Sequence, residues 1–385
     1  MTKNTSKNNK NGLVQKGKLD ITFLSLVLIL LTFGLVMLFS ASYAYSLEYF
    51  DNSYKFILSQ SIYAAIGIIA LFVASRINYH IWRAVSLPLF GVTTLLLIAL
   101  LIMPPMLQGM SVKRWFAIGG FSFQPSEIAK FAIVIFLATL IAANQKKMTQ
   151  WKFVLSLFAI VGVTSVLVVC EPHISAAVLI AAIGFVLLVV GGLHRMVITA
   201  CILAVVGGIA LVIITQSTGF ISYGSDRIAN WIDPWSDATG GGFQTIQSLL
   251  AIGSGGVLGR GLGQSRQKYL WVPEPHNDFI FSIVCEELGL IGAVVIIVLF
   301  ALLVWRGFKI AMCAPDKFGS LLAIGLTFQV GLQAMLNIWV VTNTIPNTGI
   351  GLPFFSYGGT SLVLLLAEMG VVLSVSRGSN IEKLS

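Results

Sequence analysis

Runs of apolar residues long enough to cross a membrane recur along almost the whole of this 385-residue chain. A transmembrane helix needs about 20 predominantly apolar residues, and stretches of that length are typical of membrane proteins. The predicted spans are residues 20–44, 56–75, 81–103, 127–144, 152–169, 174–192, 197–215, 279–305, 319–341 and 358–376. Because 57% of the residues are hydrophobic and only 10% are charged, an ordinary soluble domain is excluded. The sequence therefore predicts an all-α polytopic membrane protein with about ten transmembrane helices.

The distribution of basic residues predicts how these spans are oriented. Five lysines precede the first span, and most of the 24 lysine and arginine residues fall at the N-terminus, the C-terminus and alternate connections. By the positive-inside rule these segments are cytoplasmic. The predicted organisation is a cytoplasmic basic tail (residues 1–19), a ten-helix membrane domain (20–376) and a cytoplasmic tail (377–385). The net charge of +9 is explained by this topology and by contact with anionic lipids, so no nucleic-acid partner is indicated.

Three polar or irregular segments fall on the opposite, extracytoplasmic side. They are residues 104–126, a large loop between the seventh and eighth spans at about 216–278, and the Pro- and Gly-rich stretch 343–361. Within the large loop, apolar residues recur at helical spacing over 243–250, which predicts a short amphipathic helix on the membrane surface. Irregular backbone at membrane depth is tolerated only where it is buried in protein or lines a polar cavity. The three segments together predict an outward-facing cavity.

Asp278 lies where the eighth span begins, at the predicted boundary between water and lipid. The stretch from Gly259 to Gly289 that contains it is unusually rich in charged residues for this chain. A carboxylate is costly to place in hydrocarbon, so acids retained at such a depth usually have a function. The alternative is that Asp278 only caps the helix, a position that Asp favours. We take Asp278 as the candidate catalytic residue.

Several polar residues lie deeper in the predicted membrane. Three are acids, namely Glu286, Glu287 and Glu368. For these, hydrogen bonding to a neighbouring helix or pairing with a cation such as Lys130 is favoured over catalysis. Three more recur at i, i+4 and i+8 in the ninth span, namely Gln329, Gln333 and Asn337. That spacing predicts a polar ladder between helices.

Basic residues on the extracytoplasmic side form two groups, one in each large loop. They are Lys113, Arg114 and Lys130 in the first, and Arg227, Arg260, Arg266 and Lys268 in the second. Cations beside a Gly-rich backbone suit a diphosphate. The alternative is that they pair with nearby acids and hold the loops together; it is favoured for Arg266 and stays open for Arg114, Arg260 and Lys268. The four cysteines and four histidines show no spacing typical of a disulfide framework or a metal site.

Three long motifs resemble those of one family. They are KRWFAIGGFSFQPSEIAK (113–130), GRGLGQSRQKYLWVPEPHNDFIFSIVCEELGLIG (259–292) and IPNTGIGLPFFSYGGTS (345–361). The chain resembles the SEDS family (shape, elongation, division and sporulation), the peptidoglycan glycosyltransferases typified by FtsW, RodA and SpoVE. The resemblance covers essentially the whole chain, and the wording of the central motif is closest to the FtsW/SpoVE branch.

The resemblance implies roles for individual positions. The family's essential aspartate falls on Asp278, which implies that this residue is catalytic. The matching motifs, together with the nearby basic residues, imply a substrate-binding set of Arg114, Trp115, Glu127, Lys130, Arg260, Lys268, Glu274 and His276, with no protein-bound metal. The chain departs from the family at 171–175, which reads EPHIS: His173 replaces the acid of a P-D-x-G sequence, which puts the role of that acid in doubt here.

The activity that the resemblance implies is polymerisation of lipid II into glycan strands at the outer face of the bacterial cytoplasmic membrane, with release of undecaprenyl diphosphate. The expected partner is a class B penicillin-binding protein acting as the transpeptidase, alongside divisome or sporulation proteins. A divalent cation, Mg²⁺ or Mn²⁺, is an optional cofactor, and no organic cofactor is expected. The alternative is a flippase or transporter of lipid-linked precursors. A transporter places its polar site near the midplane, often between repeats, whereas the densest polar chemistry here lies outside.

Overall fold

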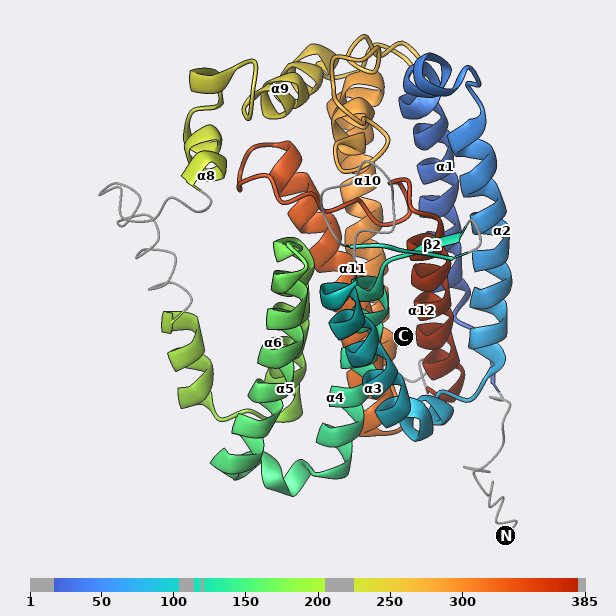
Figure 1. The fold of residues 1–385 in the computed structure, drawn as a ribbon. Coiled ribbons are helices and arrows are strands. Elements are labelled where there is room, and N and C mark those ends of the chain that lie inside the picture. Colours follow the sequence, from blue (N-terminus) through green and yellow to red (C-terminus); the bar gives the residue numbers. More distant parts are fainter. Residues whose placement is uncertain (1–16, 104–113, 119–120, 205–224, 380–385) are drawn as a thin grey trace.

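The computed structural model describes residues 17–103, 114–118, 121–204 and 225–379 of the chain. In these ranges nine helices are long and apolar enough to cross a membrane (Figure 1). They are α1 (Ile21–Phe50), α2 (Lys55–Arg76), α3 (His80–Ile102), α4 (Pro125–Ala143), α5 (Trp151–Cys170), α6 (Ile174–Gly191), α10 (Ile280–Met312), α11 (Lys317–Val341) and α12 (Gly359–Gly378). The predicted all-α polytopic class is confirmed, apart from one short β-hairpin.

The seventh predicted span, 197–215, is only partly covered. A shorter apolar helix, Arg195–Ala204, begins where that span was expected, and the rest of the span lies outside the described residues. The other nine predictions each correspond to one helix, although α1 and α10 extend six or more residues past their predicted ends. Their extra turns are the more polar ones, which a hydropathy pattern does not detect.

Both ends of the described chain lie at the same end of the helix bundle. The side chain of Asp20 caps α1 by accepting a hydrogen bond from the Phe23 amide at 2.9 Å, and it pairs with Arg306 at 2.9 Å. The Asp20 amide in turn donates to the Ser376 hydroxyl of α12 at 3.3 Å. The predicted even number of spans requires both ends to lie on the same side, which agrees with this arrangement.

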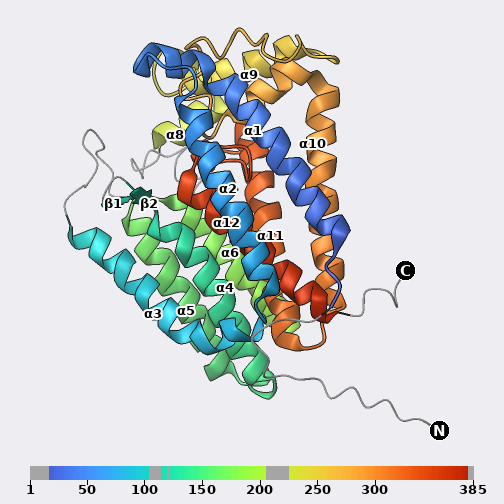
Figure 2. The ribbon, with the colours of Figure 1, turned by 90° about the vertical axis from the view of Figure 1, so that its right-hand side faces the viewer.

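The opposite end, called the outer end below, carries α8 (Ser225–Ile232), the 3₁₀ turn η2 (Pro234–Asp237) and α9 (Phe243–Gly255). Figures 1 and 2 show α8 and α9 at the upper end of the bundle. The predicted helix near 243–250 is confirmed as α9, but its polar side does not face water. Gln247 and Ser248 are buried, and the Ser248 hydroxyl donates to the Val341 carbonyl at 2.8 Å. Leu250 is exposed instead.

A short antiparallel hairpin, β1 (Phe116–Ile118) and β2 (Phe121–Phe123), follows α3 in the first outer loop. The prediction contained no strand. Strands of three residues are too short to produce a recognisable alternation of polar and apolar residues. The hairpin delivers the chain to the start of α4, and Ser122 accepts a hydrogen bond from Thr360 of α12 at 3.2 Å.

Helix α10 is interrupted at Gly289, whose φ of 66° lies in the left-handed region. The break frees the carbonyl groups of Glu286 and Glu287, and the amides of Arg260 and Gly261 donate to them, each at 3.0 Å. A Cβ at Gly259 would lie 2.2 Å from the Glu287 carbonyl oxygen, so only glycine permits this approach. The glycine-rich loop is thus explained by docking against a broken helix.

The irregular segment between α11 and α12 is partly buried and partly lines the cavities described below, the two situations in which irregular backbone was expected at membrane depth. Leu352 and Phe355 are almost completely inaccessible to solvent. Gln60 of α2 satisfies the backbone there, donating to the Ser356 carbonyl and accepting from the Gly358 amide at 3.3 and 3.2 Å. The Ser356 hydroxyl donates to the Asn277 carbonyl at 2.6 Å, which ties the segment to the residues just before α10.

Candidate functional site

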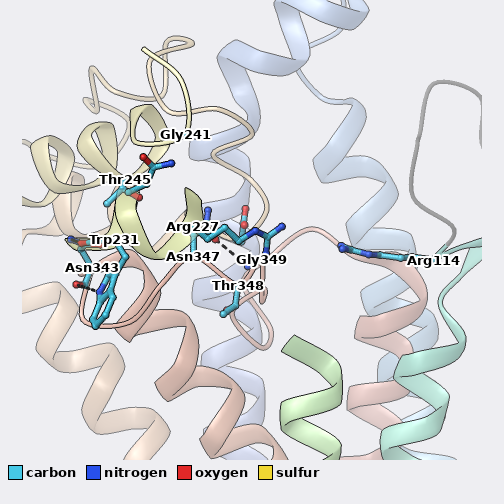
Figure 3. Close-up of a pocket in the computed structure, with 11 residues that line it drawn as sticks. Arg114, Arg227, Trp231, Gly241, Thr245, Asn343, Asn347, Thr348 and Gly349 are labelled. Carbon is cyan, nitrogen blue, oxygen red and sulfur yellow. Dashed lines mark hydrogen bonds between the residues drawn. The ribbon is translucent and has the colours of Figure 1, made fainter. Parts of the chain in front are cut away.

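Two cavities meet at the outer end of the bundle and share Asp278, Arg114 and Gly349. The larger, of about 770 Å³, reaches between α2, α4, α6, α11 and α12. The smaller, of about 450 Å³, lies beneath α8 and α9 (Figure 3). Its lining is Arg114, Arg227, Asn230, Trp231, Gly241, Thr245, Asp278, Asn343, Asn347, Thr348 and Gly349. The three segments therefore do border a cavity, in two parts, at the end of the bundle opposite the described termini.

Asp278 is half-buried and lies just before α10. The cap residue of α10 is Phe279, and no side-chain capping bond is found there among the described residues, so capping does not account for the aspartate. Asn337 of α11 donates to the Asp278 backbone carbonyl at 2.6 Å, which fixes its position. Burial, reinforced by the charge of Glu274, raises the pKa of Asp278 to about 6. A carboxyl group tuned toward neutral pH suits proton transfer.

Glu274 and His276 both line the larger cavity. Glu274 is exposed and accepts a hydrogen bond from Asn277 at 2.8 Å. The His276 ring is buried between aromatic neighbours, with its centroid 4.2 Å from that of Phe56 and 4.8 Å from that of Tyr45. Burial lowers the pKa of His276 to about 4, so the ring is neutral. Its packing suits a rigid wall for the cavity.

Arg114 and Trp115 precede β1, and both line the larger cavity. The Arg114 guanidinium donates a hydrogen bond to the Pro172 carbonyl between α5 and α6. Burial, and then the nearby charge of Arg227, lower the pKa of Arg114, while Glu171 opposes the shift. Arg114 is therefore a cation held at the junction of the two cavities.

Lys130 is buried in the wall of the larger cavity, where its ammonium group lies 2.7 Å from Glu127 and 3.1 Å from the Gln333 side-chain oxygen. Gln333 also donates to the Gly351 carbonyl at 3.0 Å, and Gln329 donates to Glu368 at 2.9 Å. Together with Asn337, these contacts confirm the predicted polar ladder on α11. Glu368 borders the same cavity from α12.

Lys268 and Arg260 line neither cavity. The Lys268 ammonium group is 3% exposed and donates to the Ser40 hydroxyl, the Gly263 carbonyl and Glu287 at 3.0, 2.7 and 3.0 Å. All three of its N–H donors are thus used inside the protein. Arg260 lies 3.7 Å from Glu286. These contacts place both cations away from Asp278, in a loop-holding role, and give the predicted substrate contacts no support.

Glu286 and Glu287 are completely buried, as predicted, but their partner is not Lys130. Their carboxylates accept hydrogen bonds from the 263–267 backbone, for example from the amides of Arg266 and Gly263, each at 2.9 Å. The amides of the glycine-rich loop therefore bind carboxylates and helix carbonyls of the protein itself. Periodicity placed these acids inside the bundle, but it could not reveal that the loop folds back onto them.

His173, which replaces the family's acid, accepts hydrogen bonds at Nδ1 from Gln124 at 3.0 Å and Ser126 at 3.1 Å. Burial and nearby cations lower its pKa to about 3, so it is a neutral acceptor in the larger cavity. Glu171 lies close to Arg114 and is fully buried; burial raises its pKa to about 8. The acid nearest to His173 in the sequence, Glu171, therefore lines neither cavity.

Four residues that line the smaller cavity carried no sequence pattern that marked them as site residues. They are Trp231, Asn343, Asn347 and Thr348. Arg227 was noted only as one of several basic residues. Neutral polar residues in a loop carry no signal of their own, because their significance depends on which distant segment they face. Asn343, Asn347 and Thr348 do fall in or next to the third long motif, which was the one available sign.

Comparison with known proteins places these observations in a family. Residues 21–381 match the family model described as cell cycle protein, for FtsW, RodA and SpoVE. Stage V sporulation protein E of Bacillus subtilis is 41% identical over 362 residues, covering 94% of this chain and 97% of that protein. A probable peptidoglycan glycosyltransferase FtsW of a Geobacter species is 40% identical, covering 93% and 96%.

Solved structures of related proteins have a similar fold. A chain from a peptidoglycan synthase complex, studied for its coordination of polymerisation and crosslinking, superposes with a TM-score of 0.76 at 28% identity, covering 93% of this chain and 98% of that one. The rod shape determining protein RodA of Thermus thermophilus gives a TM-score of 0.68 at 27% identity, covering 94% and 98%. With the motifs, the nine long helices of the described residues and these matches in agreement, the chain belongs to the FtsW/RodA/SpoVE family of cell cycle proteins.

Proposed function

We propose that this chain is a peptidoglycan glycosyltransferase that polymerises lipid II at the outer face of the cytoplasmic membrane, in division or sporulation cell-wall synthesis. The observation that carries the proposal is the position of Asp278, whose carboxyl group borders two cavities at once. A polymerase must hold two substrates, a growing chain and an incoming precursor, on either side of its reacting group. The relatives named peptidoglycan glycosyltransferases support the same activity.

In the proposed reaction the 4-hydroxyl of an incoming lipid II attacks the anomeric carbon of the growing chain. A new glycosidic C–O bond forms, the bond from that carbon to the diphosphate breaks, and undecaprenyl diphosphate leaves. The ionised Asp278 carboxylate takes the hydroxyl proton, a step that typically contributes about 10²- to 10⁴-fold to the rate. Arg114, at the junction of the cavities, stabilises negative charge as it develops on the leaving group.

The larger cavity suits a lipid-linked substrate because it combines polar and apolar walls. Leu179 of α6 and Leu362 and Leu365 of α12 provide apolar surface at membrane depth. The Glu127–Lys130 pair lies in the same cavity and adds a fixed cation to its wall. A polyprenyl chain would lie against the apolar residues while its polar head reaches Asp278.

A divalent cation fits this site only if the substrate supplies some of its ligands. Within the described ranges no group of three or more His, Cys, Asp or Glu side chains could hold a metal ion. Glu274 and Asp278, which border the larger cavity, are the two carboxylates available near the reacting atoms. Mg²⁺ is commonly bound by one or two carboxylates together with substrate phosphate oxygens, and it would supply charge neutralisation on the diphosphate. We propose this shared binding for Mg²⁺ or Mn²⁺.

We also propose that both termini are cytoplasmic and that a class B penicillin-binding protein is the partner that crosslinks the product. The peptidoglycan synthase complex among the similar structures supports a partnership of this kind. The alternative function, translocation of lipid-linked precursors, is less well supported because Asp278 and the smaller cavity lie at the outer end of the bundle, and only the larger cavity extends to Gln329 and Glu368 in the middle of α11 and α12.

The deciding experiment compares glycan synthesis by the wild type, Asp278→Asn and Asp51→Asn, each purified with its transpeptidase and supplied with lipid II. Asp51 is an exposed aspartate at the end of α1, outside both cavities, and asparagine also tolerates its left-handed backbone. We expect Asp278→Asn to lower the rate at least about 100-fold and Asp51→Asn to leave it unchanged. Equal rates for all three would remove Asp278 from catalysis. No glycan from a folded wild type with its partner would favour translocation.

A further inference from the structure

Two arginines, Arg114 and Arg227, face one another across the smaller cavity, which Asp278 also lines. Figure 3 shows the side chains of Arg114 and Arg227 pointing toward each other from opposite walls. Their mutual repulsion contributes to lowering the pKa of Arg114. Among the described residues neither guanidinium lies within ion-pair distance of an acid. Like charges held this way indicate a place for an anionic ligand.

The position of Arg227 is set by a reciprocal pair of hydrogen bonds one helical turn away, here called the Trp231–Asn343 clasp. The Trp231 indole donates to the Asn343 carbonyl at 3.0 Å, and the Asn343 amide group donates to the Trp231 carbonyl at 3.1 Å. Asn343 has a left-handed backbone with a φ of 55°, which asparagine accepts more readily than most residues. The clasp ties α8 to the outer end of α11, so Arg227 is held over the cavity.

Arg114, on the opposite wall, is held separately by a hydrogen bond to the Pro172 carbonyl. On the side of Arg227, Asn347 donates to Gln244 of α9 at 3.1 Å, which joins the 343–349 loop to the second helix above the cavity. Arg114 and Arg227 therefore belong to separate segments whose relative position is set by hydrogen bonds. An anion placed between them would have a cation on either side.

We propose that Arg227, positioned by the Trp231–Asn343 clasp, acts with Arg114 to bind the diphosphate group of the lipid-linked substrate. This inference rests on the proposed function and narrows the basic residues that the sequence offered for a diphosphate to Arg114 and Arg227, leaving out Arg260 and Lys268. The diphosphate is bonded to the anomeric carbon, so it must lie within a few ångströms of the reacting atoms. The smaller cavity satisfies this condition because Asp278 lines it too.

A diphosphate suits the pair better than a carboxylate of the stem peptide. It presents more than one negative charge and several acceptor oxygens, and a guanidinium can bind phosphate through two parallel hydrogen bonds. The peptide is attached to a different part of the disaccharide and has no need to approach Asp278. Negative charge also grows on the diphosphate as the bond to carbon breaks, so two cations there favour the transition state.

The test measures binding of undecaprenyl diphosphate to the complex with the transpeptidase, by direct titration in detergent, with the free stem pentapeptide as a second probe. Arg227→Gln should weaken undecaprenyl diphosphate binding by about tenfold, the usual effect of losing one hydrogen bond between charged groups. Arg227→Lys should recover part of the loss. The matched control is Arg266→Gln, because Arg266 is an exposed arginine of the same loop and lines neither cavity.

A second variant, Asn343→Ala, removes the hydrogen bond that the Asn343 side chain donates to the Trp231 carbonyl, without changing any charge. The other bond of the clasp, which the Trp231 indole donates to the Asn343 backbone carbonyl, is retained. The variant should weaken binding in the same direction as Arg227→Gln, and combining the two should add little, because both act through one side chain. Unchanged binding in Arg227→Gln would overturn the proposal. So would a variant that loses affinity only for the pentapeptide, since the anion would then be a carboxylate. Binding is measured without turnover, so a wild type that binds the probe but makes no glycan would contradict the proposed function and leave this inference standing.

Discussion

Replacing Lys268 by methionine distinguishes a loop-holding lysine from a substrate-binding one. Methionine has a similar length and no charge, so the variant removes the ammonium group and little else. Glu287 would remain with 0% exposure and no cation. Leaving one member of a buried ion pair uncompensated typically costs about 3–5 kcal/mol.

The structure places the expected loss toward the lower end of that range. Glu287 keeps three other donors when the lysine is removed: the Ser40 hydroxyl at 2.6 Å and the amides of Gly263 and Ser265 at 2.9 and 3.3 Å. We therefore expect a destabilisation of about 3 kcal/mol. Adding Glu287→Gln to Lys268→Met should recover part of it, because the second change removes the buried charge.

The assay is the midpoint of thermal unfolding of the purified protein in detergent, followed beside glycan synthesis. Lys152→Met is the matched control, because Lys152 is exposed at the start of α5 and its loss should change stability by no more than about 0.5 kcal/mol. A Lys268→Met protein with the wild-type midpoint but no glycan synthesis would refute the reasoning and return Lys268 to the substrate site.

Two further predictions concern catalysis and packing. Glycan synthesis should fall as the pH is lowered through about 6, because the raised pKa of Asp278 means that its carboxylate, the form that accepts a proton, is lost there; initial rates that stay flat to well below this pH would exclude Asp278 as the titrating base. Gly255→Ala should lower the unfolding midpoint by an amount equivalent to about 1–3 kcal/mol, because its Cβ would lie 2.0 Å from the Cys285 carbonyl oxygen. Gly253→Ala, with nothing within 4 Å of the added Cβ, should be neutral or slightly stabilising, and equal midpoints for the two variants would contradict this packing.

Much of the fold could be predicted because the signals that specify it are local. A membrane span is a run of apolar residues, and nine of the ten predicted runs match helices among the described residues. Asp278 could be placed at the beginning of a span for the same reason. The irregular backbone of the 343–361 segment could be predicted from its Pro and Gly content. That it is shielded from lipid followed from the rule that irregular backbone at membrane depth must be buried in protein or line a cavity.

The partners of the charged residues could not be predicted in this way. The sequence alone determined the membrane class, the nine spans that the structure describes in full, the end of the bundle that bears the cavities and the candidate base, since each depends on residue type and order along the chain. Only the tertiary structure decided that Lys268 pairs with Glu287 while Arg227 is held opposite Arg114. The physical reason is that α10 breaks at Gly289 and draws the glycine-rich loop inward, whereas the Trp231–Asn343 clasp holds α8 over the cavity. Two basic residues of one loop therefore have different environments, and those environments depend on contacts between segments far apart in the sequence.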